Sequence, residues 1–384
     1  MVRGVLEIDD ATDCAAWVAL GAIRPAAAFQ AVDLRGLAGF ESGSFRGCLF
    51  LSCVMSPAQA AHLTATGATV LRDDDIRPYT AHRARLYTPT ELFLGFDPAH
   101  GAGYEATFDA LVYRHWVDTG GANPTMIDET LARRLHDHSI TDALEEATHG
   151  HRRVAIMGGH GLERSDPTYG AVARIARSLT RAGLLMLSGG GPGAMEATHL
   201  GAWIAHFDDD ALVDAIALLS PRPAGGLPGQ EYADPDWLDR AWAVRGRWPL
   251  DDIPPADRFD SIGIPTWLYG HEPPNAFATM IAKYFANSVR EEGLLSIATH
   301  GVVFAPGSAG TIQEIFQDAA QNHYESFGPP SPMVLFGTSY WTATHPVRAV
   351  LDSLSSGRAY ANLITLTDDP DEVVDIITTY DRDD

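Results

Sequence analysis

Apolar runs and helical patterns alternate regularly from about residue 150 to the end of the chain. Short apolar runs at 153–157, 184–187 and 301–305 have the length of buried strands. Residues 169–182 instead carry apolar side chains at helical spacing, and a glycine follows them. This order of strand, loop and helix predicts parallel strands joined by right-handed crossovers, with helices on both faces. The expected fold is a doubly wound, Rossmann-like α/β domain.

Further expected elements complete this series. Strands are expected at 213–219, 266–269, 333–336 and 363–366, and helices at 192–203, 275–292, 311–322, 340–356 and from Pro370 onward. Gly293 is taken as the end of the helix at 275–292. Residues 221–260 are rich in proline, tryptophan and aspartate, so we expect a long loop and a candidate lid there.

Residues 1–150 have a weaker pattern, and we assign them to a separate α+β region of unknown role, followed by the Rossmann-like domain at 151–384. Residues 34–55 suggest short strands interrupted by glycine, and helices are expected at 57–66 and 125–148. The 34–55 segment loosely resembles pentapeptide-repeat coils, but one or two turns do not establish a repeat.

The composition is that of an acidic globular protein. The 384 residues suit two domains. The formal net charge of −23 argues against non-specific nucleic-acid binding, which requires lysine and arginine to neutralise phosphates. No apolar run approaches the ~20 residues that span a bilayer, and the N-terminus becomes acidic at once, so we expect a cytoplasmic protein without a membrane partner. Three cysteines favour buried thiols over disulfides.

Two glycine-rich loops follow buried strands and open helices. The first is SGGGPGAME at 188–196, and the second is PGSAGTIQE at 306–314. Glycines let backbone N–H groups approach an anion, and the helix N-terminus favours negative charge. Since parallel strands present their carboxyl ends at one edge, we expect both loops to bind one phosphorylated ligand. The expected contacts are Gly189, Gly190, Gly191, Gly193 and Glu196 in the first loop, and Gly307, Ser308, Gly310 and Thr311 in the second. A tight turn without a ligand is the alternative.

Three further features bear on chemistry. Glu314 lies one turn into the second helix, where a catalytic role and a simple interaction with the helix dipole are about equally expected. Gly159 and His160 follow the first strand. Asn275 follows a segment that contains His271 and Glu272, and a structural role for His271 and Glu272 is as readily expected as a catalytic one. Neither a dinucleotide fingerprint, a Walker A sequence nor a metal-ligand spacing is present.

These motifs together resemble the LOG (Lonely Guy) family, long mislabelled as lysine decarboxylases. The resemblance is closer to the bacterial pyrimidine/purine nucleotide 5′-monophosphate nucleosidases, which share four motifs in the same order over about 150–340. The motifs are GGH at 158–160, GPGAMEA at 191–197, EPPN at 272–275 and the loop at 306–314.

The resemblance implies a homodimer or larger homo-oligomer. It also implies hydrolysis of a nucleoside 5′-monophosphate of the AMP, GMP, CMP or UMP class to base and ribose 5-phosphate, without a cofactor or metal. Glu314 would stabilise charge on the sugar and deprotonate water, and Arg290 would orient Glu314 or the phosphosugar. His160 and Asn275 would face the base or the sugar. Ser308 stands where the P-G-G-x-G-T-x-x-E motif of the LOG family has its second glycine. Arg290 lies about one residue away from the position at which the resemblance places an arginine, near the end of the preceding helix.

Two other functions remain open. One is a non-catalytic nucleotide sensor or carrier on the same fold. The other is amino-acid decarboxylation, which needs pyridoxal phosphate and an accessible lysine. Lys283, the only lysine in the chain, is expected within a helix.

Overall fold

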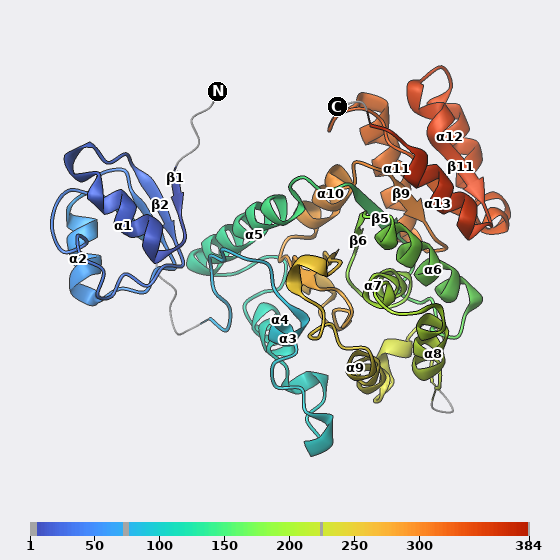
Figure 1. Cartoon of the computed structure of the whole chain (residues 1–384), viewed down its shortest axis with the longest axis horizontal. Helices are drawn as coiled ribbons and strands as arrows, with labels where there is room; N and C mark the ends of the chain where they lie inside the picture. The colour runs from blue at the N-terminus through green and yellow to red at the C-terminus, as the bar shows by residue number, and fades with distance from the viewer. Residues whose placement is uncertain (1–5, 72–76, 223–225, 383–384) are drawn as a thin grey trace. The chain divides into compact units, whose positions relative to one another are not determined.

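The computed structural model describes residues 6–71, 77–222 and 226–382, which belong to two compact units (Figure 1). The first comprises Met1–Leu86 and His115–Glu145, and the second comprises Tyr87–Arg114 and Glu146–Asp384. This division differs from the expected boundary at 150, since the segment 87–114 belongs to the second unit. The first five residues of the acidic N-terminus, and residues 223–225 of the expected long loop, lie outside the described residues.

Asp109 anchors the segment 87–114 in the second unit. Trp267 Nε1 and Tyr104 Oη donate hydrogen bonds to its fully buried carboxylate, at 2.9 and 2.7 Å. Lys283 Nζ lies 2.5 Å from the same carboxylate and is itself buried. These long-range partners could not be identified from the local sequence, which explains why the boundary was placed elsewhere.

A seven-stranded parallel sheet forms the centre of the second unit. Its strand order is β11-β10-β9-β5-β6-β7-β8. The strands are β5 (Arg153–Met157), β6 (Leu185–Ser188), β7 (Ser261–Gly263), β8 (Met280–Ile281), β9 (Val302–Phe304), β10 (Met333–Phe336) and β11 (Ile364–Thr367). All six neighbouring pairs are parallel, which confirms the α/β, Rossmann-like arrangement.

Helices cover both faces of this sheet. On one face α6 (Pro167–Arg181) packs against α7 (Ala194–Ile204) and α13 (Pro370–Thr379). On the other, α11 (Ala309–Tyr324) packs against α10 (Asn287–Ile297) and α12 (Val347–Ser355). The two groups follow from the strand order, because the connections from β5 to β6 and from β9 to β10 run in opposite directions along the sheet.

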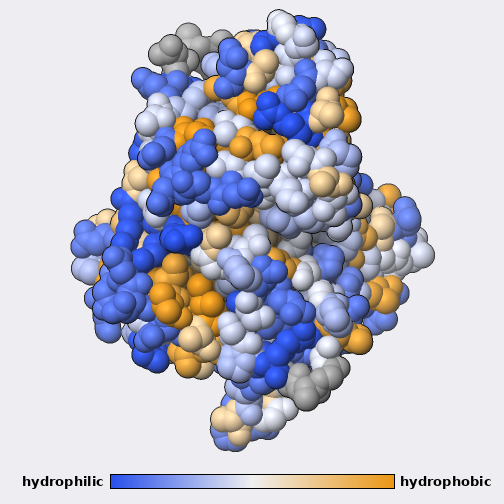
Figure 2. Space-filling view, turned by 90° about the vertical axis from the view of Figure 1, so that its right-hand side faces the viewer, coloured by the Kyte–Doolittle hydropathy of each residue, from blue (hydrophilic) through white to orange (hydrophobic). Residues whose placement is uncertain are grey.

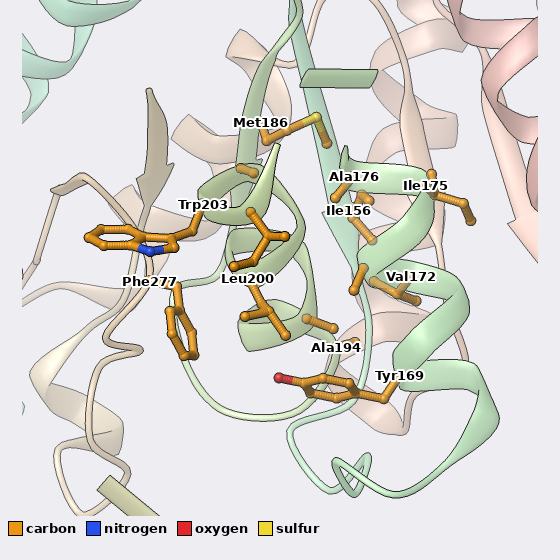
Figure 3. Close-up of a cluster of buried hydrophobic side chains, with 14 of the residues drawn as sticks. Ile156, Tyr169, Val172, Ile175, Ala176, Met186, Ala194, Leu200, Trp203 and Phe277 are labelled. Atoms are coloured by element: carbon orange, nitrogen blue, oxygen red, sulfur yellow. The ribbon is translucent and has the colours of Figure 1, made fainter. Parts of the chain in front are cut away.

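The largest core of this unit lies beneath α6 and α7. Val172, Ile175 and Ala176 of α6 belong to the cluster drawn in Figure 3, in which Ala176 lies beside Ile156 of β5. These α6 residues are fully buried, as their helical spacing predicts. The core fixes where α7 begins, and therefore where the glycine-rich loop before it lies.

Three expected elements between residues 205 and 297 are wrong. The expected strand 213–219 is the end of helix α8 (Asp209–Leu219), because Asp208 caps the helix by accepting a hydrogen bond from Ala211 N. The expected strand 266–269 is a 3-10 turn, Trp267–Tyr269, and β7 lies just before it. The expected helix 275–292 is divided into β8 and α10, and α10 continues past Gly293. The expected long loop contains a helix, α9 (Trp237–Arg247).

The first unit contains a second parallel sheet, with strands in sequence order. Its strands are β1 (Leu6–Ile8), β2 (Ala27–Gln30), β3 (Leu49–Leu51) and β4 (Thr69–Leu71), and its helices include α1 (Ala11–Ala19) and α2 (Pro57–Ala65). Leu6 pairs with Ala27, Ala28 with Leu49 and Leu49 with Thr69, so each strand lies 20 or 21 residues after its neighbour. The four parallel strands therefore follow one another at a nearly constant interval along the chain.

The remaining helices are α3 (Pro89–Leu92), α4 (Phe108–Asp118) and α5 (Ile127–Thr148), the last of which confirms the helix expected at 125–148. Among the described residues, no helix is both long enough and apolar enough to cross a membrane. Figure 2 shows a largely hydrophilic face on which hydrophobic residues gather in small groups, in keeping with the acidic composition.

Candidate active site

Strands β5 and β9 mark the point where the order of strands reverses. From β5 the chain passes through β6 and β7 to β8, and then returns to β9 on the other side of β5. Because the connections leave in opposite directions, a crevice opens beyond the carboxyl ends of these strands, where ligands bind in open α/β sheets. The β5 loop (residues 158–162), the β6 loop (residues 189–193) and the β9 loop (residues 306–310) all lie at this edge.

Backbone contacts bring these three loops together. Gly159 N–H donates to the carbonyl of Pro306 at 3.0 Å, and Ala194 N–H donates to the carbonyl of Gly159 at 3.1 Å. A β-carbon at Gly159 would lie 3.2 Å from the α-carbon of Gly307. The expectation that the glycine-rich loops share one edge is therefore confirmed.

Two glycines of the β6 loop are required by its conformation. Gly190 and Gly193 have φ angles of +71° and +70°, which disfavour other residues. A β-carbon at Gly193 would also lie 2.6 Å from the carbonyl oxygen of His160. The whole loop is buried, so its shape is fixed by the surrounding chain.

A buried polar chain supports the β6 loop from below. Ser188 Oγ accepts a hydrogen bond from Gly190 N–H at 3.0 Å and lies 2.8 Å from His199 Nε2. The other ring nitrogen of His199 lies 2.9 Å from Ser261 Oγ on β7. Burial lowers the pKa of His199 to about 3, so this imidazole is neutral and serves structure rather than acid–base chemistry.

The N-terminus of α11 is open to solvent. Ser308 occupies the N-cap position but makes no side-chain capping bond, and Ser308, Ala309 and Gly310 are all exposed. A β-carbon at Gly310 would meet nothing within 4 Å. The first N–H groups of a helix lack intrahelical acceptors, so this end can bind an anion such as phosphate.

Ser308 fits the β9 loop without strain. Its φ is −97°, an ordinary value for a residue with a side chain. The hallmark glycine is therefore not needed here for backbone conformation. Thr311 is buried, with its hydroxyl directed at Gly307, so it closes the loop from the inside.

Arg290 and Glu314 form a buried ion pair beside the loops. Arg290 Nη1 lies 3.4 Å from Glu314 Oε1, and each residue is 8% exposed. Arg290 Nε donates to the carbonyl of Ile264 at 2.8 Å, while Nη2 borders Gly189 and donates no hydrogen bond within the described residues. The apparent one-residue offset of Arg290 in the sequence therefore does not prevent the contact.

Burial shifts the protonation of Glu314. Desolvation raises its pKa from 4.5 to about 7, and Glu291 adds to the shift, whereas Arg290 opposes it. Desolvation dominates because the side chain has a single cationic partner at 3.4 Å. A carboxyl group with a pKa near neutrality can both accept and release a proton under physiological conditions.

Glu272 is a second carboxylate at the loops. Its Oε2 would lie 3.7 Å from a β-carbon at Gly191, and its side chain is only 15% exposed. Its Oε1 lies 3.9 Å from both His160 Nδ1 and His271 Nε2, beyond hydrogen-bond length. Desolvation raises the pKa of Glu272, against the opposing charges of His160, His271 and Arg290. The sequence left its role open, and the structure places it at the edge of the β6 loop.

The segment after α8 reaches the same edge. A β-carbon at Gly161 would lie 3.3 Å from the α-carbon of Gly229, and the ring of Tyr232 lies 6.2 Å from that of His160 in an edge-to-face arrangement. Arg222 pairs with Glu163 at 2.6 Å and thereby ties this segment to the β5 loop. The neighbourhood of the exposed His160 is therefore aromatic as well as acidic.

Glu196 does not lie in the crevice. It is fully buried, and Arg164 binds both of its carboxylate oxygens, at 2.8 and 2.6 Å. Tyr169 Oη donates a third hydrogen bond at 3.0 Å. The expectation that Glu196 contacts a ligand is therefore wrong, because its position in α7 turns the side chain toward α6 rather than toward the loops.

Asn275 has a structural role that the sequence did not specify. Its Oδ1 accepts hydrogen bonds from the N–H groups of Phe277 and Ala278, and its own N–H donates to the carbonyl of Gly190. Its buried Nδ2 makes no hydrogen bond within the described residues. Asn275 therefore holds the segment after Glu272 against the β6 loop.

Lys283 cannot serve an aldehyde cofactor in this arrangement. It is buried against Asp109 and Trp267 and does not lie in the expected helix. Elsewhere, Asp9, Asp10 and Asp13 are exposed carboxylates close enough to hold a cation, but Asp10 already caps α1.

These features define an α/β protein with a carboxylate–arginine site between glycine-rich loops. Comparison with family models and with curated protein sequences finds no match. Among solved structures, the chain is similar to a molybdenum cofactor binding protein from Rippkaea orientalis, with 14% identity and a TM-score of 0.36 over 60% of this chain and 98% of that one. It is also similar to a molybdenum cofactor carrier protein from Chlamydomonas reinhardtii, with 13% identity and a TM-score of 0.36 over 59% and 96%. These similarities concern the fold alone.

Proposed function

We propose that the protein hydrolyses the N-glycosidic bond of a nucleoside 5′-monophosphate to give free base and ribose 5-phosphate. The observation that carries this proposal is the buried pair of Arg290 and Glu314, in which the pKa of Glu314 is raised to about 7. The pair borders a loop edge suited to phosphate. The proposal also rests on the sequence resemblance to nucleotide 5′-monophosphate nucleosidases.

Phosphate would bind at the open end of α11. The amides of Gly310 and Thr311 lie in the first turn of this helix, and the space above Gly310 is free. The unpaired Nη2 of Arg290 would orient the phosphosugar. Holding the phosphate in this way fixes the ribose relative to Glu314 before the reaction begins.

Glu314 would act on C1′ and on water. Cleavage of the bond between C1′ and the base nitrogen develops positive charge on the sugar, which a nearby carboxylate stabilises. The ionised carboxylate also deprotonates the attacking water. Since the pKa of Glu314 is raised to about 7, turnover should increase as pH rises through neutrality.

The direct test combines a substrate panel with a conservative variant. Purified protein is incubated with AMP, GMP, CMP and UMP, and free base is measured by chromatography. Glu314→Gln should retain affinity for ribose 5-phosphate by calorimetry while losing at least about 100-fold in base release. Glu292→Gln, which removes an exposed carboxylate from neighbouring α10, is the matched control. Unchanged base release by Glu314→Gln would remove Glu314 from the mechanism.

A second candidate is a nucleotide carrier without turnover. The specific observation in its favour is that Arg290 and Glu314 already neutralise each other, and that Arg290 Nε is held by the carbonyl of Ile264. In that case incubation with the same nucleotides would show binding but no release of free base.

As in the family that the sequence resembles, we propose a cytoplasmic homodimer or larger oligomer, which sedimentation analysis would test.

A further inference from the structure

Glu272 is the least satisfied carboxylate at the loop edge. No hydrogen bond reaches either oxygen from the described residues, although the side chain is only 15% exposed. Two histidine nitrogens, His160 Nδ1 and His271 Nε2, lie 3.9 Å from its Oε1. A carboxyl group held mostly out of water without donors is costly unless it is protonated or meets a ligand.

Glu272 and Arg290 contact the β6 loop two residues apart. Arg290 Nη2 borders Gly189, and Glu272 Oε2 faces Gly191. Two residues of chain span at most about 7 Å, so the two side chains border the same small region. Arg290 in turn pairs with Glu314. Two carboxyl groups, those of Glu272 and Glu314, therefore lie near one arginine. Glycosidases also act with two carboxyl groups, which are placed around the scissile bond.

The surroundings of Glu272 suit a base rather than a phosphate. Tyr232 and the exposed His160 offer ring surfaces beside its carboxyl group. The open α11 terminus lies instead at the β9 loop. A nucleotide with its phosphate at α11 and its ribose at Glu314 would direct its base toward these rings.

We infer that Glu272 is the general acid that protonates the departing base. This inference rests on the proposed function. The C1′–N bond breaks, and its electron pair goes to the base nitrogen. The Glu272 carboxyl O–H transfers its proton to the base. The oxygen of water bonds to C1′, and Glu314 takes the proton of that water. Exchange with solvent returns Glu314 to carboxylate and Glu272 to carboxylic acid, so the net reaction adds one water.

Burial makes the acid form of Glu272 available, because desolvation raises its pKa. Activity on AMP should therefore fall at high pH as Glu272 loses its proton. This decline opposes the rise through about pH 7 that is expected from Glu314, so the two carboxyl groups act on the pH profile in opposite directions.

The test uses a leaving group that needs no proton. Base release from AMP is compared with nitrophenolate release from 4-nitrophenyl β-D-ribofuranoside 5-phosphate for the wild type, Glu272→Gln, Glu314→Gln and the control Glu292→Gln. Glu272→Gln should lose at least about 100-fold on AMP but less than about 5-fold on the nitrophenyl substrate. Glu314→Gln should lose activity on both, and the wild type should lose its high-pH decline on the nitrophenyl substrate.

The outcomes distinguish failure of the general-acid role of Glu272 from failure of the proposed hydrolysis. Equal losses for Glu272→Gln on both substrates, or a high-pH decline that persists with the nitrophenyl substrate, would overturn the general-acid role while leaving hydrolysis intact. Release of neither product by the wild type would overturn the proposed function, and the inference with it. The wild-type pH profile does not depend on whether a variant folds.

Discussion

Asp318 should make the stability of the second unit depend on pH. It lies on the buried side of α11, is 3% exposed, and its Oδ2 has no hydrogen-bond partner within the described residues. It borders a cavity of about 30 Å³ together with Asn322, whose Nδ2 is also unpaired within them. Desolvation raises the pKa of Asp318 from 3.8 to about 8.

The sign and size of the effect follow from that shift. Between pH 3.8 and about pH 8 the folded chain keeps a proton on Asp318 that the unfolded chain releases. The free energy of unfolding therefore falls as pH rises through this window. One pKa unit corresponds to about 1.4 kcal/mol, so ionisation of Asp318 in the unfolded chain costs the folded state about 2 kcal/mol at pH 5 and about 4 kcal/mol at pH 7.

Asp318→Asn replaces the titrating carboxyl group by an amide of nearly the same shape. Urea denaturation at pH 5, 6, 7 and 8 should show the variant gaining stability over the wild type, by a margin that grows with pH to about 4 kcal/mol at pH 7 and about 5 kcal/mol at pH 8. Glu292→Gln, at an exposed position, is the matched control and is measured at the same four pH values. A pH-independent difference for Asp318→Asn would refute the assigned protonation.

Three further predictions concern buried charges and the loop edge. Glu196→Gln should lower the free energy of unfolding by about 3–5 kcal/mol, measured by urea denaturation, because Arg164 is left buried with a neutral partner; intact stability would contradict the pairing. Lys283→Met should cost a similar amount, and adding Asp109→Asn should restore most of it; additive losses would argue against the pair. Gly310→Val should weaken ribose 5-phosphate binding by calorimetry at least about tenfold with little change in stability, since the added carbons occupy free space; unchanged affinity would place the phosphate elsewhere.

The sequence was sufficient to predict the strands at the centre of the sheet. Residues 153–157 and 301–305 are continuous apolar runs, and a run of that kind fits a strand that is buried on both faces. The loops that follow could also be placed, because parallel strands put their carboxyl ends at one edge. The strand predicted at 213–219 is wrong, because an apolar run alone does not distinguish a strand from a buried helix. Asp208 and the acids after it were the helix signal.

Roles that depend on a distant partner could not be predicted. Glu196 lies within a glycine-rich motif, yet its side chain meets Arg164, 32 residues earlier in the chain. For Glu272 the local sequence does not show that the carboxyl group faces the β6 loop, where the structure places it beside Gly191. The sequence identified which segments meet at the edge, whereas the direction of each side chain depended on how the helices pack.

Replacement of Ser308 tests directly whether the β9 loop already has a conformation that can bind phosphate. A serine would harm this loop only if the backbone required positive φ, which costs roughly 1–2 kcal/mol for a residue with a side chain. Its φ of −97° removes that cost, and its hydroxyl makes no capping bond that glycine would lose. Ser308→Gly should therefore change the free energy of unfolding and ribose 5-phosphate affinity by only a few tenths of a kcal/mol, measured by urea denaturation and calorimetry. A tenfold gain in affinity, equivalent to about 1.4 kcal/mol, would mean that the serine holds the loop away from its binding conformation.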